Sequence, residues 1–459
     1  MRIPPSIHRQ TPHLTFTLSR SGSDFLISLQ LYAWLIYPNP LGTQSSSRVP
    51  PQFRHQALSD KCFPGDLQMT KYLKGWLMPA LSALMMWGIS HGGWWMWAPW
   101  AFVLTVFLSA DMFLPHDLSE PPKYQNAFLL NLPLYTILPL LAVLNFMVIW
   151  MVGSGDFLGF GAWVQQHLDI DLFAARDRTT HWGMWAGCIV SVGLMNAVGG
   201  TVTGHELTHR SSKFDLFMGR WMLAFTCDTS FGIEHVYGHH VRVATPADPA
   251  TGRRGESFYK FTVRSTIMSY VHAYQLEKAR LAKLGKSVWN PFASPFLRGN
   301  LENIFMFVAA YYIAGLPGLG FWAILAFVGK QYLEITNYFE HYGLVRVPGE
   351  PVQPRHSWNS NHWGSTNVLY SLARHSHHHA EGEAPYWTLN AYPNAPMLPA
   401  GYLGMLLIAL VPPLFKHLMT PALNDWDEKH ASPAERKLAQ QISRESGMTG
   451  LKIINAKLA

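Results

Sequence analysis

The stretch from His205 to His240 decides the fold, and it contains two histidine-rich motifs. They are His205-Glu206-Leu207-Thr208-His209 and Glu234-His235-Val236-Tyr237-Gly238-His239-His240. Far downstream lies a third motif, His375-Ser376-His377-His378-His379, and between them lies His341, in Glu340-His341-Tyr342-Gly343. Apolar runs long enough to cross a membrane surround these motifs. The pattern predicts a metal site in a membrane protein.

The composition indicates a membrane protein rather than several soluble domains. Only 14% of the 459 residues are charged, against about 25% in soluble domains. The net charge of +7 does not indicate nucleic acid binding, because the basic residues lie in loops beside apolar runs, where they report membrane orientation. The cysteines (Cys62, Cys188 and Cys227) follow no CxxC or paired spacing, so we expect neither a disulfide framework nor a cysteine metal site.

Six apolar runs are predicted to span the membrane, which makes the fold class all-α and polytopic. They occupy residues 75–89, 97–114, 129–152, 182–202, 301–315 and 321–335. The first two form a hairpin at His91-Gly92-Gly93, and the last two turn at Gly315-Leu316-Pro317-Gly318. A further apolar stretch, at residues 402–415, is expected to reach the interface.

The loop charges predict the orientation of these helices. Residues 242–298 carry ten Lys and Arg against three acids, which indicates a cytoplasmic loop. The fourth and sixth runs then end on the cytoplasmic side, directly before His205 and His341. All the histidine motifs are therefore expected at the cytoplasmic ends of the helices.

Three segments are predicted along the chain. Residues 1–68 are expected to be a disordered extension or to precede the true start, for which Met69 is a candidate. Residues 69–423 form the membrane-bound domain. Residues 424–459 form a cytoplasmic helical tail, in which Ser432-Pro433-Ala434-Glu435 predicts a capping box with proline at the first helical position. We expect the tail to be a solvated helix.

The spacing of the histidines in the first two motifs predicts which of them can bind the same metal ion. His205 and His209 are four residues apart, so on a helix they share one face and can bind one metal. His235 and His239 repeat that spacing. His240 is rotated by about 100° from His239 and cannot bind the same metal from the same side.

The third motif repeats the problem of adjacent histidines. His375 shares a face with His378 or with His379, but those two diverge. A site with two metals needs such pairs, because one motif then supplies both ions. The candidate ligands are nine histidines: His205, His209, His235, His239, His240, His341, His375, His378 and His379.

An imidazole-dominated site suits Zn, Cu, Fe or Ni, and a pair of such sites with apolar walls suits oxygen activation at iron. Three carboxylates, Glu206, Glu234 and Glu340, each lie beside a candidate ligand in sequence. They are predicted to accept hydrogen bonds from the imidazoles and fix their tautomers.

Two other classes fit part of the pattern. His205-Glu206-Leu207-Thr208-His209 matches the HExxH motif of zinc proteases, with Glu206 as general base. That hypothesis leaves the motifs with adjacent histidines unexplained. A histidine-lined metal transporter would carry its histidines near the membrane midplane rather than at span ends. The metal content distinguishes the three classes of protein. An oxygen-activating site would hold two irons, a zinc protease one zinc, and a transporter labile ions.

The motifs resemble the membrane fatty-acid desaturase and hydroxylase superfamily, and within it the alkane omega-hydroxylase branch, with the xylene monooxygenase hydroxylase component as a near relative. The branch is marked by Asn337-Tyr338-Phe339-Glu340-His341-Tyr342-Gly343-Leu344 and by His356-Ser357-Trp358-Asn359-Ser360-Asn361-His362. Thr245-Pro246-Ala247-Asp248-Pro249 adds to the match. The chain departs from the branch at His377, where an acidic residue is usual, and at Val236-Tyr237.

The resemblance implies two iron ions held by the nine histidines and O2-dependent hydroxylation of the terminal carbon of medium- to long-chain n-alkanes. It also implies electrons from rubredoxin and its NADH-dependent reductase, and a bacterial inner-membrane location with the site on the cytoplasmic side. An alkane would enter from the bilayer, and the basic residues of 242–298 would suit docking of an acidic electron carrier. Chain-length preference, methyl-aromatic against alkane substrate, acyl-lipid desaturation and oligomeric state stay open.

Overall fold

The computed structural model describes residues 72–124 and 126–452. Within these ranges the chain forms helices and loops without a β-strand, so the predicted all-α class is confirmed. The expected extension, residues 1–68, lies outside the described residues.

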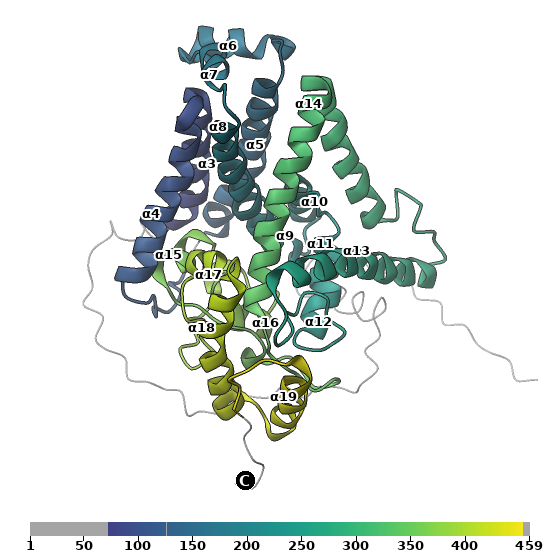
Figure 1. Ribbon diagram of the computed structural model, residues 1–459. Coiled ribbons are helices and arrows are strands. Elements are labelled where there is room, and N and C mark those ends of the chain that lie inside the picture. Colours follow the sequence, from purple (N-terminus) through teal and green to yellow (C-terminus); the bar gives the residue numbers. More distant parts are fainter. Residues whose placement is uncertain (1–71, 125, 453–459) are drawn as a thin grey trace, which may run out of the picture. The chain divides into compact units, whose positions relative to one another are not determined.

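Four helical segments are long and apolar enough to cross a membrane. They are Gly93–Phe113, which joins η3 (Gly93–Trp97) to α4 (Ala98–Phe113); α5 (Ala127–Val152); Trp182–Thr208, which joins α8 (Trp182–Met195), η5 (Asn196–Val202) and α9 (Thr203–Thr208); and α14 (Pro295–Glu340). Figure 1 shows them packed side by side with α3 (Leu77–His91). The first predicted span is α3, which has only 15 residues, so the number of membrane crossings stays a prediction.

The two predicted hairpins are confirmed. Gly92 and Gly93, with φ of 64° and 58°, turn the chain between α3 and η3. Helix α14 contains both of the last two predicted spans, and its helical geometry breaks at Ala314 and Gly315. Gly315 has φ of 62°, a conformation that glycine adopts without steric cost. The two limbs of α14 meet at this point (Figure 1).

Further helices connect these segments. At one end of the bundle lie η4 (Phe157–Gly159), α6 (Phe160–Leu168) and α7 (Leu172–Arg178). At the other end lie α10 (Lys213–Leu223), η6 (Ala224–Thr226), α11 (Phe231–Glu234), η7 (His235–His239), α12 (His240–Arg242), α13 (Phe258–Lys283), α15 (Trp363–Val368) and α16 (His375–Ala380). The remaining 3-10 turns are η2 (Leu73–Trp76), η8 (Pro354–His356) and η9 (Tyr386–Thr388).

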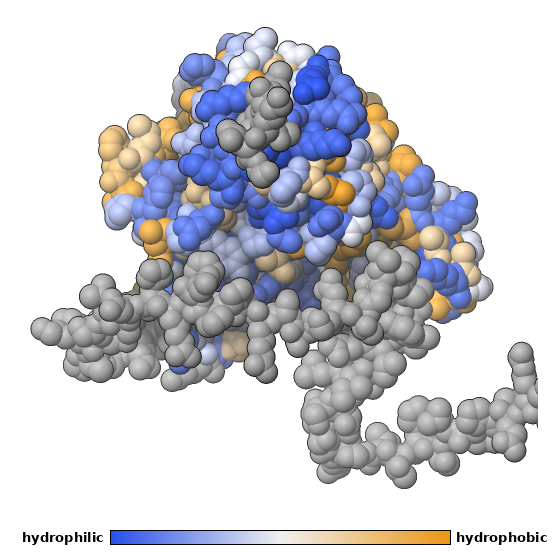
Figure 2. Space-filling model, turned by 90° about the horizontal axis from the view of Figure 1, so that it is seen from below, coloured by the Kyte–Doolittle hydropathy of each residue, from blue (hydrophilic) through white to orange (hydrophobic). Residues whose placement is uncertain are grey.

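The last helices build a second apolar core at the same end as the histidines. They are α17 (Tyr402–Ala409), α18 (Pro412–Asp425), η10 (Trp426–His430) and α19 (Pro433–Ser446). Met405 and Phe415 are fully buried there, whereas Leu410, Val411 and Leu414 of the same stretch are exposed, so its contact with the membrane interface stays a prediction. Seen from this end, the surface is mainly hydrophilic, with apolar residues toward its edges (Figure 2).

The tail is more tightly attached than a solvated helix would be. The predicted capping box is confirmed, with Ser432 as N-cap and Pro433 at the first turn of α19. Glu435, however, is 99% buried and binds His356 at 2.7 Å. Asp427 forms a buried ion pair with Arg254 at 2.7 Å. Because both partners lie outside the tail, the tail helps to hold the loops around the histidines.

Candidate metal centre

The structure brings all nine candidate histidines together, five in one group and four in a second group whose two overlapping ligand sets share His341. The first group has five members, and the Nε2 atoms of its neighbouring rings lie 2.8–3.3 Å apart. Its members are His205, His209, His235, His240 and His378. In the second group, neighbouring Nε2 atoms lie 3.1 Å apart. Its members are His239, His341, His375 and His379.

A π-helical turn decides how the second motif is divided. Residues His235–His239 form η7, in which hydrogen bonds join residues five apart. His235 therefore lies beside His240, with their Nε2 atoms 3.0 Å apart. The expected pairing of His235 with His239 is wrong, because it assumed α-helical spacing; His239 belongs to the other group.

The third motif lies on an ordinary helix, α16. His375 and His379 are one turn apart, and their Nε2 atoms are 3.1 Å from each other. His378 points to the first group, where its Nε2 lies 3.1 Å from that of His205. The second and third motifs therefore each contribute to both groups, as the adjacent histidines predicted.

The donor set fits metal ions. Burial, with the neighbouring imidazoles, lowers the pKa of His209 to about 3 and the pKa of His240 well below its usual value. Neutral imidazole is the form that binds metals. Nitrogens bound to one ion at about 2.1 Å lie about 3 Å from each other, which is the spacing found here.

The carboxylate that fixes an imidazole tautomer is Asp248. Its Oδ2 accepts a hydrogen bond from His239 Nδ1 at 2.9 Å, and both side chains are fully buried. Burial alone would raise the pKa of Asp248, but its interaction with His239 and the hydrogen bond from Thr251 hold that pKa below its usual range. Asp248 lies in the Thr245–Pro249 motif. The sequence instead predicted Glu206, Glu234 and Glu340 for this role, because each is adjacent to a candidate ligand in sequence.

The three predicted acceptors have other partners. Glu206 forms an ion pair with Arg210 at 2.6 Å and accepts from the backbone N–H of Tyr386. Glu234 contacts His272 rather than a candidate ligand. Neither holds the tautomer of a neighbouring histidine.

Glu340 reaches the ligand atoms themselves. It accepts a hydrogen bond from the Tyr402 hydroxyl at 2.8 Å, and its Oε2 lies 3.5 Å from His375 Nε2. Because Nε2 is the atom that faces the other histidines, this carboxylate lies on the metal side of the ring. Glu340, His341 and His375 together form a possible ligand set.

The other histidines near the motifs have structural partners. His377 accepts from the backbone N–H of Asn390 at 2.6 Å and stacks on Tyr392, so its ring lies outside both groups. His356 binds Glu435, and His362 packs against His116.

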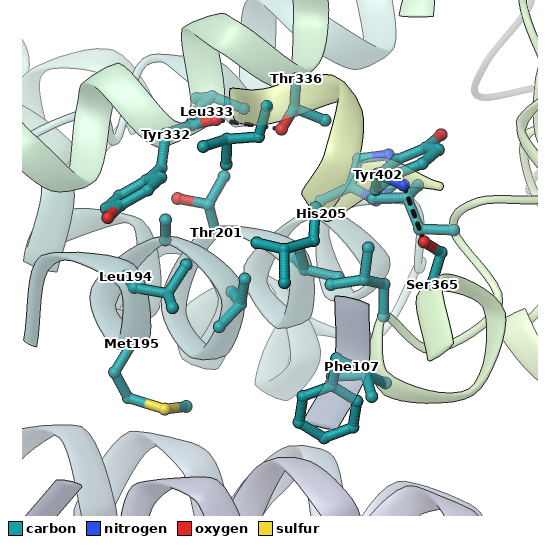
Figure 3. Close-up of a pocket in the computed structure, with 18 of the residues that line it drawn as sticks. Phe107, Leu194, Met195, Thr201, His205, Tyr332, Leu333, Thr336, Ser365 and Tyr402 are labelled. Carbon is teal, nitrogen blue, oxygen red and sulfur yellow. Dashed lines mark hydrogen bonds between the residues drawn. The ribbon is translucent and has the colours of Figure 1, made fainter. Parts of the chain in front are cut away.

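An apolar cavity ends at the histidines. Its walls come mainly from side chains of α3, α4, α8, η5, α14, α15 and α17, and His205, His235 and His375 form part of one end. In Figure 3, His205 and Tyr402 lie across the cavity from Leu194 and Met195. The arrangement can hold a hydrocarbon chain with one end against the histidines.

Membrane-length helices with a histidine cage at one end define an integral membrane protein with a metal centre. The fatty acid desaturase family model matches residues 180–408. An alkane 1-monooxygenase of Ectopseudomonas oleovorans is 33% identical over 391 residues, which cover 81% of this chain and 90% of that relative. Alkane 1-monooxygenase 1 of Alcanivorax borkumensis is 34% identical over 357 residues, covering 76% and 83%. The xylene/toluene monooxygenase hydroxylase component of Pseudomonas putida is 30% identical over 379 residues, covering 82% and 95%.

The chain belongs to the alkane 1-monooxygenase branch of the fatty acid desaturase family. It is therefore an oxygen-dependent oxidoreductase, as the resemblance predicted.

Proposed function

We propose that this protein is a non-haem di-iron monooxygenase that converts n-alkanes to primary alcohols. One oxygen atom of O2 enters the terminal C–H bond, and the other leaves as water with two electrons and two protons. Rubredoxin, reduced by its NADH-dependent reductase, supplies the electrons. The site lies on the cytoplasmic side of a bacterial inner membrane, which agrees with the basic loop at residues 242–298.

The observation that carries the proposal is the apolar cavity that ends at the two histidine groups. The five-membered group would hold one iron, and His239, His341, His375 and His379 would hold the other, with Glu340 beside them. Bound there, the ions would supply the redox chemistry that activates O2.

The side chains of the protein would position the substrate and exclude water from the cavity. Leu194, Met195 and Phe107 line the apolar cavity, which would receive an unbranched chain with its terminal carbon toward the histidines. Asp248 holds His239 in the tautomer whose Nε2 is free to bind a metal.

The zinc protease hypothesis fits the structure less well. A general base must be available to a water molecule at the metal. The Glu206 carboxylate is instead engaged by Arg210 and by the Tyr386 backbone N–H. A methyl-aromatic hydroxylase remains the second candidate, because the xylene/toluene enzyme is similar over most of both chains.

The test is an assay of membranes that contain the full chain with rubredoxin, its reductase, NADH and O2. Octane, hexadecane and xylene are the substrates, and mass spectrometry identifies the products. We expect 1-octanol or 1-hexadecanol and two irons per chain. Methylbenzyl alcohol as the main product would move the protein to the second candidate, an alkene from an acyl chain would indicate a desaturase, and a single bound zinc would overturn the di-iron site.

A further inference from the structure

A buried carboxylate lines the hydrocarbon cavity. Asp111 lies in the last turn of α4, within a membrane-length segment, and only 7% of its surface is exposed. Burying an ionisable group inside a membrane segment costs free energy, and such residues usually have a functional partner. A saturated hydrocarbon offers the carboxylate none. Of the two carboxylates among the described lining residues, Glu340 lies against His375, whereas Asp111 interacts with His362, a histidine outside both metal-binding groups.

The position of the carboxylate is tightly fixed. Asp111 Oδ1 accepts from the backbone N–H of Ser365 at 2.9 Å, and Oδ2 accepts from the Ser365 hydroxyl at 2.6 Å. Two glycines pack against it: a Cβ on Gly401 would lie 2.1 Å from Oδ2, and a Cβ on Gly364 would lie 2.8 Å from Oδ1. Each carboxylate oxygen has a further lone pair, so the group can accept one more hydrogen bond without moving.

A short chain of contacts joins Asp111 to the metal centre. Ser365 Oγ accepts from the backbone N–H of Tyr402 at 2.8 Å, and the Tyr402 hydroxyl donates to Glu340. One tyrosine side chain therefore separates the Asp111 and Ser365 pair from the carboxylate beside His375. Figure 3 shows Ser365 and Tyr402 together on one side of the cavity, near His205.

We propose that Asp111 is the hydroxyl-binding residue of this cavity. It accepts a hydrogen bond from the O–H of the primary alcohol and draws the product's polar end away from the histidines, toward the last turn of α4. The inference rests on the proposed function, because only oxidation gives the ligand a hydroxyl. An alkane makes no such bond, so Asp111 distinguishes product from substrate.

The test compares Asp111→Asn with wild type in the same membranes. Asparagine preserves the shape and the acceptor for Ser365 N–H but removes the charge. Inhibition of octane hydroxylation by added 1-octanol gives Ki, and the same data give KM for octane. We expect Ki to rise about tenfold, because a hydrogen bond to a charged acceptor is lost, while KM for octane stays within about twofold.

The matched control is Asp215→Asn, which makes the same chemical change at a buried carboxylate that binds Tyr135 outside the cavity. It should leave Ki unchanged. A Ki for Asp111→Asn equal to wild type overturns the inference. Equal changes in Ki and KM also overturn it, since they show that Asp111 shapes the cavity rather than binding the hydroxyl.

A second measurement separates this inference from the proposed function. The stabilisation of the purified full chain by 1-octanol in thermal unfolding needs no turnover. Wild type should gain more stability from 1-octanol than Asp111→Asn does, and equal gains would refute the subsite. If the protein hydroxylates no alkane, the function proposal fails, and this comparison still decides whether Asp111 binds a hydroxyl.

Discussion

His378 and His379 are neighbours in sequence, yet their Nε2 atoms belong to different histidine groups. On α16 successive side chains point about 100° apart, so one short helix reaches two sites. His377, on the same helix, points to Asn390 and Tyr392 instead. The chemistry of each histidine is thus set by its direction from the helix, not by its place in a motif.

Substitution of one ligand in each group is expected to remove one metal at a time. His209→Ala and His379→Ala should each lower bound iron from about two per chain to about one and abolish hydroxylation, because each group loses a nitrogen donor. Elemental analysis of purified protein measures the iron. His377→Asn is the matched control, since its amide can still accept from Asn390, and it should retain both ions. Iron loss in this control equal to that in His379→Ala would contradict the assignment.

Asp248 is expected to control metal affinity through its hydrogen bond with Nδ1 of His239. Asp248→Asn should weaken binding at the second group by about 10- to 100-fold, because the carboxylate no longer fixes the imidazole tautomer. Competition with a chelator measures the affinity. Glu234→Gln serves as control: Glu234 is adjacent to His235 in sequence but binds His272, so chelator sensitivity should not change. If Glu234→Gln were more sensitive to the chelator than Asp248→Asn, the original prediction that Glu234 fixes an imidazole tautomer would be supported instead.

At the scale of elements, the π-turn η7 and the tail helix α19 shape the site. Residues five apart face the same way in η7, which places His235 and His240 together. Helix α19 acts at a distance through Glu435, which binds Arg355 and His356 in the loop before Trp358. The backbone N–H of Trp358 in turn donates to the carbonyl of Glu340 at 2.8 Å, next to His341. The tail therefore supports the loop that packs on the second histidine group.

The Glu435 contact predicts an acid-sensitive tail. Burial raises the pKa of Glu435, but hydrogen bonds from His356 and Arg355 outweigh it and lower the pKa to about 2. The ionised carboxylate therefore stabilises the folded state above about pH 4.5, and this contribution is lost as pH falls toward 2. Glu435→Gln should lower the melting temperature at neutral pH, and its difference from wild type should shrink below about pH 4. A difference independent of pH would show that the charge of Glu435 contributes nothing.

At the scale of the whole molecule, the histidines, the second apolar core and the hydrophilic surface gather at one end of the helix bundle (Figures 1 and 2). Under the proposed function, a membrane-soluble substrate would reach the metals from the bundle, and a soluble electron donor would approach from the hydrophilic end. Several basic residues of 242–298 already have acidic partners: Arg254 pairs with Asp427, Arg264 with Glu256 and Arg280 with Glu277. These ion pairs reduce the number of basic side chains that remain available to bind an acidic partner.

We therefore expect the exposed basic residues of 242–298 to bind the acidic electron carrier. Arg253, Lys260 and Lys286 are exposed, and replacing all three with alanine should raise KM for rubredoxin severalfold at low ionic strength, with a smaller effect at high salt. KM for octane should not change, because the cavity is untouched. Steady-state kinetics at two salt concentrations measures both constants. A KM for rubredoxin that does not respond would leave membrane orientation as the role of these charges.

The sequence by itself determined the all-α class, the turns between apolar runs and the histidine inventory. It could do so because span length, glycine turns and ligand chemistry are local properties. Only the tertiary structure decided the division of the histidines, since the π-turn at His235–His239 is not visible in α-helical spacing, and His205 meets His378 across 173 positions of sequence. It also decided the partners of the carboxylates. Asp248 and Asp111 act through contacts that depend on how distant loops close, whereas Glu206 and Glu234, adjacent to histidines in sequence, point elsewhere.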